Sequence, residues 1–161
     1  MLFNKYRKEN KQTICILGVL ILSAKLAKAD GNFSVLEEEE ILKIIPHEPE
    51  QKPVLKRILK EAADESENRS IYQDAEHIKK IFDGDQPEML EFIVAVLYRI
   101  AHSDHFYSNE EDQMIKKIAQ IFEVKEPLVN QIINYTKKYS NLLFWRRNIA
   151  WFNKYTWKIF S

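Results

Sequence analysis

The chain has 161 residues, of which 45% are hydrophobic and 30% are charged, and it contains only 3 glycines and 5 prolines. This composition is typical of one soluble helical domain, because β-sandwiches and barrels use many more glycine and proline residues in their turns. The single cysteine, Cys15, excludes an internal disulfide, and the sequence has no Cys/His spacing of the kind that binds zinc.

The net charge of zero hides an uneven distribution along the chain. The first 134 residues hold 18 basic and 24 acidic side chains, a net charge of −6, whereas the last 27 residues hold six basic and no acidic side chains. Such asymmetry indicates that the two parts meet different partners.

Residues 14–22 form an apolar run that follows several basic residues, and residues 27–29 have the small-residue pattern of a signal-peptidase site. The run is either a secretory signal or the first core helix. We favour the core helix, because Lys25 and Lys28 are charged where a signal peptide is neutral. The run is also too short to span a bilayer, which needs about 20 apolar residues.

The spacing of apolar residues predicts further helices, and no β-alternation competes with them. A polar stretch at residues 64–70 is expected to be a loop. Residues 89–101 are apolar on every side, which predicts a position at the centre of the bundle. The sequence therefore predicts an all-α fold. The further predicted helices cover residues 34–45, 53–62, 72–82, 87–101, 108–122 and 127–139.

A short pattern occurs twice, at residues 30–37 and, 74 positions later, at residues 104–111. Each copy has an aspartate, an aromatic residue three positions on, a serine next, and a glutamate three further on. An internal repeat of this kind predicts two pseudo-symmetric helix-turn-helix units.

The Ser-x-x-Glu part of the repeat is a capping box. Ser34 and Ser108 should each start a helix, with Glu37 and Glu111 reaching back to the serine N–H. The two aspartates are expected at the end of the preceding helix, where the helix dipole disfavours a carboxylate. Capping therefore explains the serine and the glutamate but not the aspartate.

The two turns, the helices between them and the sequence Leu-Tyr-Arg-Ile-Ala-His-Ser-Asp at residues 97–104 resemble the TerB-like domain of tellurite resistance proteins. They are especially similar to the version at the N-terminal side of DjlA-type DnaJ-like co-chaperones, over about residues 12–138. The resemblance implies a compact bundle of about seven helices in which the two turns approach one another. It also implies that acidic residues of the turns bind a divalent metal ion. The matching residues are Asp30, Glu37, Asp104 and Glu111.

Two departures qualify this resemblance. His105 stands where the family usually has glycine, and the chain has no His-Pro-Asp tripeptide, so it lacks the J-domain that would stimulate an Hsp70 partner.

Four carboxylates make a hard oxygen site suited to Ca²⁺, Mg²⁺ or Mn²⁺. The alternative is that the glutamates only cap their helices and the aspartates are solvated. The first turn is not an EF-hand, because Ile41 stands where the last glutamate ligand belongs. His102 and His105, with Asp104, offer nitrogen ligands for a transition metal, but no third nitrogen or sulfur is near in sequence.

No nucleophile elbow, Cys/His pair, P-loop or dinucleotide-binding motif is present, so we expect a non-enzymatic protein.

The residues after 134 hold all 3 Trp and 9 of the 19 aromatic side chains. A helix over residues 139–161 would carry a basic stripe and a broad apolar face, as interfacial helices on anionic lipid do. The alternatives are a last core helix or a connector to a downstream domain. The predicted membrane- or partner-binding residues are Trp145, Arg147, Trp151, Lys154, Trp157 and Lys158.

We therefore expect a cytoplasmic, stress-related binding module with an acidic metal site and a protein partner, held at the membrane surface where the C-terminal helix docks. Nucleic-acid binding is not expected, because the rest of the domain is acidic. The alternative is the helical regulatory or localisation domain of a DnaJ-like co-chaperone whose J-domain is not in this chain.

Overall fold

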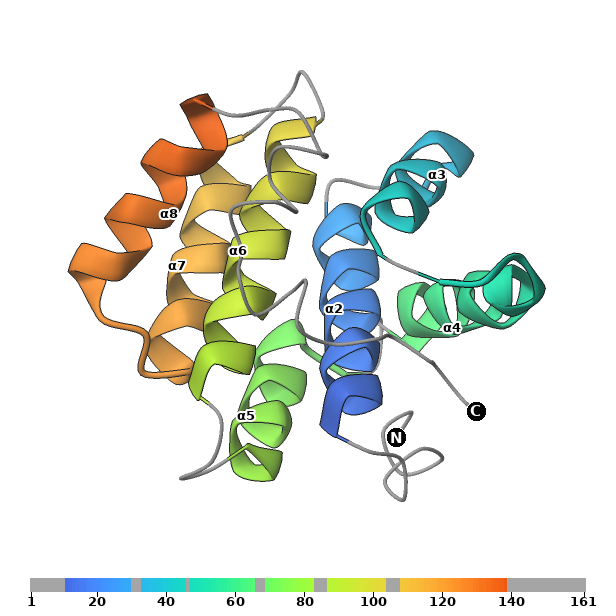
Figure 1. The fold of residues 1–161 in the computed structure, drawn as a ribbon, viewed down its shortest axis with the longest axis horizontal. Coiled ribbons are helices and arrows are strands. Elements are labelled where there is room, and N and C mark those ends of the chain that lie inside the picture. Colours follow the sequence, from blue (N-terminus) through green and yellow to red (C-terminus); the bar gives the residue numbers. More distant parts are fainter. Residues whose placement is uncertain are drawn as a thin grey trace.

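The computed structural model describes residues 11–29, 33–45, 47–65, 69–82, 87–103 and 108–138. Within these ranges the protein has seven α-helices, one short 3₁₀-helix and no strand, which confirms the predicted all-α fold (Figure 1). The elements are α2 (Lys11–Lys28), α3 (Val35–Ile44), η1 (Pro49–Gln51), α4 (Lys52–Glu65), α5 (Ile71–Ile81), α6 (Pro87–Ser103), α7 (Asn109–Ile121) and α8 (Glu126–Lys138).

Helix α2 is the core helix of the bundle, as its apolar run predicts. Every residue from Thr13 to Leu26 is buried, Cys15 included, because α4, α5 and α6 pack around it. Helix α6 also lies at the centre, as the apolar residues 89–101 predict, and it packs against α2, α3, α7 and α8. Helix α6 is mostly buried but leaves Glu91 and Arg99 partly exposed, so α2 is the helix enclosed on all sides.

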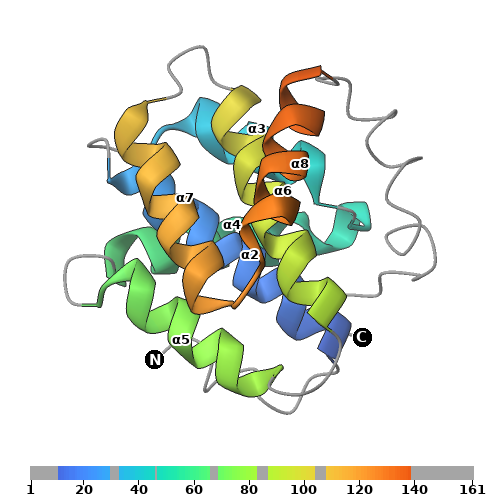
Figure 2. The ribbon, with the colours of Figure 1, turned by 90° about the vertical axis from the view of Figure 1, so that its left-hand side faces the viewer.

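The first helices of the two repeats, α2 and α6, pack against each other. Figures 1 and 2 show that both run in the same general direction, so their C-terminal ends point to the same side of the molecule. Helix α3 packs against α2, α4 and α6, whereas α7 packs against α5 and α6, and α8 covers α6. The repeats therefore interlock, because the second helix of the first repeat touches the first helix of the second.

Gly18 lies where α2 meets α5 and α6. A Cβ atom at this position would lie 3.2 Å from Cδ1 of Ile78 in α5 and 3.5 Å from Cδ1 of Ile93 in α6. The missing side chain lets the three helices approach closely.

Helix α4 continues through Glu65 and so includes the first two residues of the stretch at 64–70 that was expected to be a loop. The Glu65 carboxylate bonds to Lys25 of α2, and this contact favours the extra residues of helix.

Among the described helices, none is both long and apolar enough to cross a membrane.

Candidate functional site

Two of the four predicted metal-binding carboxylates, Asp30 and Asp104, lie outside the described residues. The other two are described. Glu37 is the third residue of α3 and Glu111 is the third residue of α7. The structure thus describes one carboxylate from each turn, on the helix that follows it.

In the first turn, Ser34 caps α3 as predicted, with an extended backbone at φ −89° and ψ 160°. Its hydroxyl oxygen accepts from the Glu37 N–H at 3.1 Å. The return bond differs from the expected one, because the Ser34 hydroxyl itself donates to Oε1 of Glu37 at 3.0 Å. The serine therefore orients the glutamate side chain as well as capping the helix.

In the second turn, Ser108 repeats this geometry. Its hydroxyl accepts from the Glu111 N–H at 3.0 Å and donates to Oε1 of Glu111 at 3.3 Å. The two glutamates differ in burial, since Glu37 is half-buried whereas Glu111 is only 6% exposed. Removing a carboxylate from water is costly unless hydrogen bonds or a cation compensate, and the Ser108 hydroxyl supplies one such hydrogen bond to Glu111.

Tyr98 lies in α6, the helix that leads into the second turn. Its hydroxyl is buried and has no hydrogen-bond partner in the described structure. Burial raises the pKa of Tyr98, and the negative charge of Asp112 in α7 raises it further. The Tyr98 carbonyl accepts from Nδ1 of His102, one turn later, at 2.8 Å. The sequence pattern did not single out Tyr98 or Asp112 as site residues. The one indication was a tyrosine within the apolar residues 89–101.

Arg99 connects the second repeat to the first. Burial lowers the pKa of its guanidinium, and the carboxylate of Glu40 in α3 opposes this shift. Arg99 of α6 is thus held near an acidic residue of the other repeat.

Within the described ranges, no three His, Cys, Asp or Glu side chains lie close enough together to hold a metal ion. The four-carboxylate site depends on Asp30 and Asp104, and the alternative nitrogen site on His105, so both stay predictions. The six predicted docking residues of the C-terminal segment also lie outside the described residues.

Residues 17–133 match a family model described as tellurite resistance protein TerB. The chain belongs to the TerB family. The match includes both capped turns and most of the helical bundle. No curated protein and no solved structure gives a significant match. The closer similarity of this TerB domain to DjlA-type co-chaperones stays a prediction.

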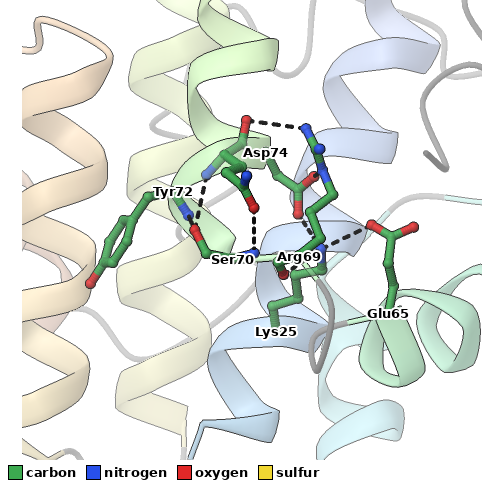
Figure 3. Close-up of polar contacts among 7 residues, drawn as sticks. Lys25, Glu65, Arg69, Ser70, Tyr72 and Asp74 are labelled. Carbon is green, nitrogen blue, oxygen red and sulfur yellow. Dashed lines mark hydrogen bonds and ion pairs between the residues drawn. The ribbon is translucent and has the colours of Figure 1, made fainter.

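The TerB domain also contains a buried cluster of charged side chains that sequence analysis did not anticipate (Figure 3). The ammonium of Lys25 lies 3.0 Å from Oε1 of Glu65 and 3.3 Å from the Arg69 carbonyl oxygen, and it forms an ion pair with Asp74. The other Asp74 oxygen, Oδ1, accepts from Nε of Arg69 at 2.7 Å.

The cluster joins α2, α4 and α5 and balances two cations with two carboxylates. Lys25 of the first repeat is equivalent in position to Arg99 of the second. Each TerB repeat therefore carries a buried or half-buried cation in its first helix, five residues before the aspartate of the turn. The indication in the sequence is Lys25, a lysine that directly follows an apolar run and that also argues against a signal peptide.

Proposed function

We propose that this TerB domain is a non-enzymatic binding module that holds a divalent metal ion between its two repeats. The observation that carries the proposal is the buried Glu111 carboxylate at the start of α7. Its counterpart Glu37 occupies the same position of α3 and has the same serine contacts. The helices that lead into the two turns, α2 and α6, end on the same side of the bundle.

The donor set fits a hard cation. Carboxylate oxygens are the ligands preferred by Ca²⁺, Mg²⁺ and Mn²⁺. Glu37 and Glu111 would supply one carboxylate from each repeat, oriented by Ser34 and Ser108, and the turn aspartates would supply the others. A bound ion would neutralise these carboxylates and tie the two turns together.

Isothermal titration calorimetry of the full chain with CaCl₂, MgCl₂ and MnCl₂ tests this proposal. We expect saturable binding of one of these ions and a rise in melting temperature with that ion. The double variant Glu37→Gln/Glu111→Gln should lose both, while costing less than about 1 kcal/mol of stability, because glutamine also serves at the third position of a capped helix.

The matched control is Glu39→Gln/Glu110→Gln, which removes the same charge from exposed positions near the starts of the same helices. This control should keep the binding heat. If the two double variants and the wild type show equal melting shifts with added metal, the glutamates only cap and the metal proposal fails.

We extend the proposal to residues 139–161, which would attach the module to an anionic membrane surface. The support is the sequence, with six basic and no acidic residues after residue 134 and three tryptophans. Each Lys or Arg near an anionic surface adds about 1 kcal/mol of attraction. Co-sedimentation with phosphatidylserine vesicles should fall as salt rises, and should be weakened by Arg147→Gln/Lys154→Gln/Lys158→Gln.

Removing residues 141–161 should abolish vesicle binding without unfolding the bundle. If the deletion unfolds the domain, the aromatic residues belong to the core and the docking proposal is wrong. If the intact chain ignores vesicles at low salt, the membrane proposal is also wrong, and a protein partner becomes the surface to test.

A further inference from the structure

A groove of about 630 Å³ lies between the C-terminal end of α2, the start of α3 and one face of α4. These three helices pack against one another, and Figure 1 shows α3 and α4 on the same side of α2. Four cations line the groove, namely Lys28 of α2 and Lys56, Arg57 and Lys60 of α4. The volume falls within the usual range of ligand pockets, about 300–1,000 Å³.

The four cations have no ion-pair partner among the described residues, and the three on α4 are exposed. Elsewhere in the described chain some cations are paired, as Lys25 is with Asp74 and Lys116 with Asp112. A concentration of unpaired positive charge in a domain that is otherwise acidic makes this groove different from the surface around it.

The charges of α4 are also arranged against its own helix dipole. The helix has no acidic residue in its first turn and no basic residue in its last turn, where it carries Asp64 and Glu65. A helix is stabilised by the reverse arrangement. Glu65 is explained by its bond to Lys25. Lys56, Arg57 and Lys60 lie in the interior of α4, where the helix dipole has little effect, so the dipole does not account for their place.

We propose that this groove binds an acidic, amphipathic peptide segment of a partner protein. Carboxylates of the segment would pair with the α4 cations, and its apolar side chains would contact Phe33 and Ala63, which line the same groove. Two further apolar side chains, Val35 and Leu36, are 69% and 75% exposed at the start of α3, close to Phe33 in the sequence. This inference stands on the groove and does not depend on the metal site or the C-terminal segment.

The lining favours a peptide over other anions. Glu38 and Asp64 also line the groove and would repel a dense polyanion such as a phosphate cluster, whereas a peptide can place its carboxylates selectively. A flat anionic bilayer cannot enter a groove. The basic C-terminal segment of the chain carries the same charge as the α4 cations, so it is not the occupant.

Fluorescence anisotropy tests the proposal with the full chain and a labelled helical peptide that has glutamates on one face and leucines on the other. A peptide with glutamine in place of every glutamate is the matched probe. We expect saturable binding of the acidic peptide, weaker at high salt, and no binding of the glutamine peptide. The variant Lys56→Gln/Lys60→Gln should weaken binding roughly tenfold, as expected for the loss of two charge contacts.

The matched control is Lys80→Gln/Lys125→Gln, which makes the same change in net charge at exposed positions away from the groove. It should bind the peptide as the wild type does, and all variants should keep the same melting temperature. Absence of saturable binding to the wild type, or equal weakening in both double variants, would overturn the proposal.

Two further measurements distinguish other occupants. If inorganic phosphate displaces the peptide at lower concentration than free glutamate does, the groove is a phosphate site and the peptide proposal is wrong. If sedimentation shows a dimer that Lys56→Gln/Lys60→Gln dissociates, the occupant is a second copy of this chain, and the proposal is again wrong.

Discussion

The ammonium of Lys25 and the carboxylate of Asp74 form an ion pair in which only 1% of each side chain is exposed. The two residues are 49 positions apart in the sequence and join α2 to α5. Glu65 and Arg69 surround the pair, so no charge in the cluster is left alone in the interior. Buried pairs of this kind are costly to break from one side, because the remaining charge keeps its desolvation penalty.

Replacing Lys25 with Met should therefore destabilise the domain strongly. We expect a loss of about 3 kcal/mol in the free energy of unfolding, the lower part of the usual range for broken buried pairs, because Arg69 still contacts Asp74. Urea unfolding followed by circular dichroism measures this. The control Lys43→Met removes an exposed pair with Glu40 and should cost less than about 0.5 kcal/mol.

A second variant separates lost charge pairing from lost packing. Lys25→Met/Asp74→Leu removes both buried charges and lets Arg69 turn to Glu65, so it should be more stable than Lys25→Met alone. A loss below about 1 kcal/mol for Lys25→Met would show that the cluster contributes little to stability.

At Gly18 the expected effect depends on side-chain size. Alanine favours the helix by about 1 kcal/mol over glycine, but its Cβ would lie 3.2 Å from the end of Ile78, so Gly18→Ala should be nearly neutral. Gly18→Val adds methyl groups between α2, α5 and α6 and should cost about 1–3 kcal/mol. Melting temperatures of the two variants compare them directly. If valine is tolerated as well as alanine, the helices are not closely packed at this point.

Glu123, between α7 and α8, has a positive φ of 60°. Its N–H bonds to the Gln120 carbonyl at 3.0 Å and the next N–H bonds to the Ala119 carbonyl at 2.9 Å, which is the pattern that usually ends a helix with glycine. Glu123→Gly should raise stability by about 0.5–1 kcal/mol by relieving the left-handed strain.

The control for this prediction is Glu123→Ala, which keeps the Cβ atom and loses the same charge. The ion pair of Glu123 with Lys79 spans 3.5 Å with the Glu123 side chain 78% exposed, so its loss matters little. Thermal unfolding should show a gain for glycine and none for alanine. An equal gain for both would assign the effect to charge rather than to backbone strain.

The pKa of His77 is lowered from its ordinary value of 6.5, first by burial and then by the positive charge of Arg69. Because the folded pKa is below the unfolded one, the unfolded chain binds the proton first as the pH falls. The contribution of His77 to stability is therefore present above about pH 6.5 and is lost as the pH falls through its folded pKa. NMR titration should place the His77 midpoint below 6.5.

Arg69→Gln should move the His77 midpoint upward, since Asp74, which raises this pKa, would remain without the opposing guanidinium. His77→Gln should flatten the decline of stability between about pH 7 and pH 5. A wild-type midpoint at or above 6.5 would contradict the assigned burial of the ring.

The local features of the fold were readable in the sequence. Apolar spacing predicted the helices, Ser34 and Ser108 marked helix starts, and the repeat predicted two similar turns. These features could be predicted because helix caps and helical faces depend on residues three or four positions apart. The extent of α4 was less predictable, because its last residue, Glu65, is held by a contact with a distant helix.

By itself, the sequence determined that this chain is an all-α protein with two related units. In each unit a serine caps a helix whose third residue is a glutamate. Only the tertiary structure decided which charges are buried and which are paired. Lys25 and Lys56 are the same residue type in amphipathic or apolar helices, yet one is enclosed beside Asp74 and the other lines an open groove. The physical reason is that burial and ion pairing depend on which helices pack together, and those partners lie 40 to 49 positions away from Lys25 along the chain.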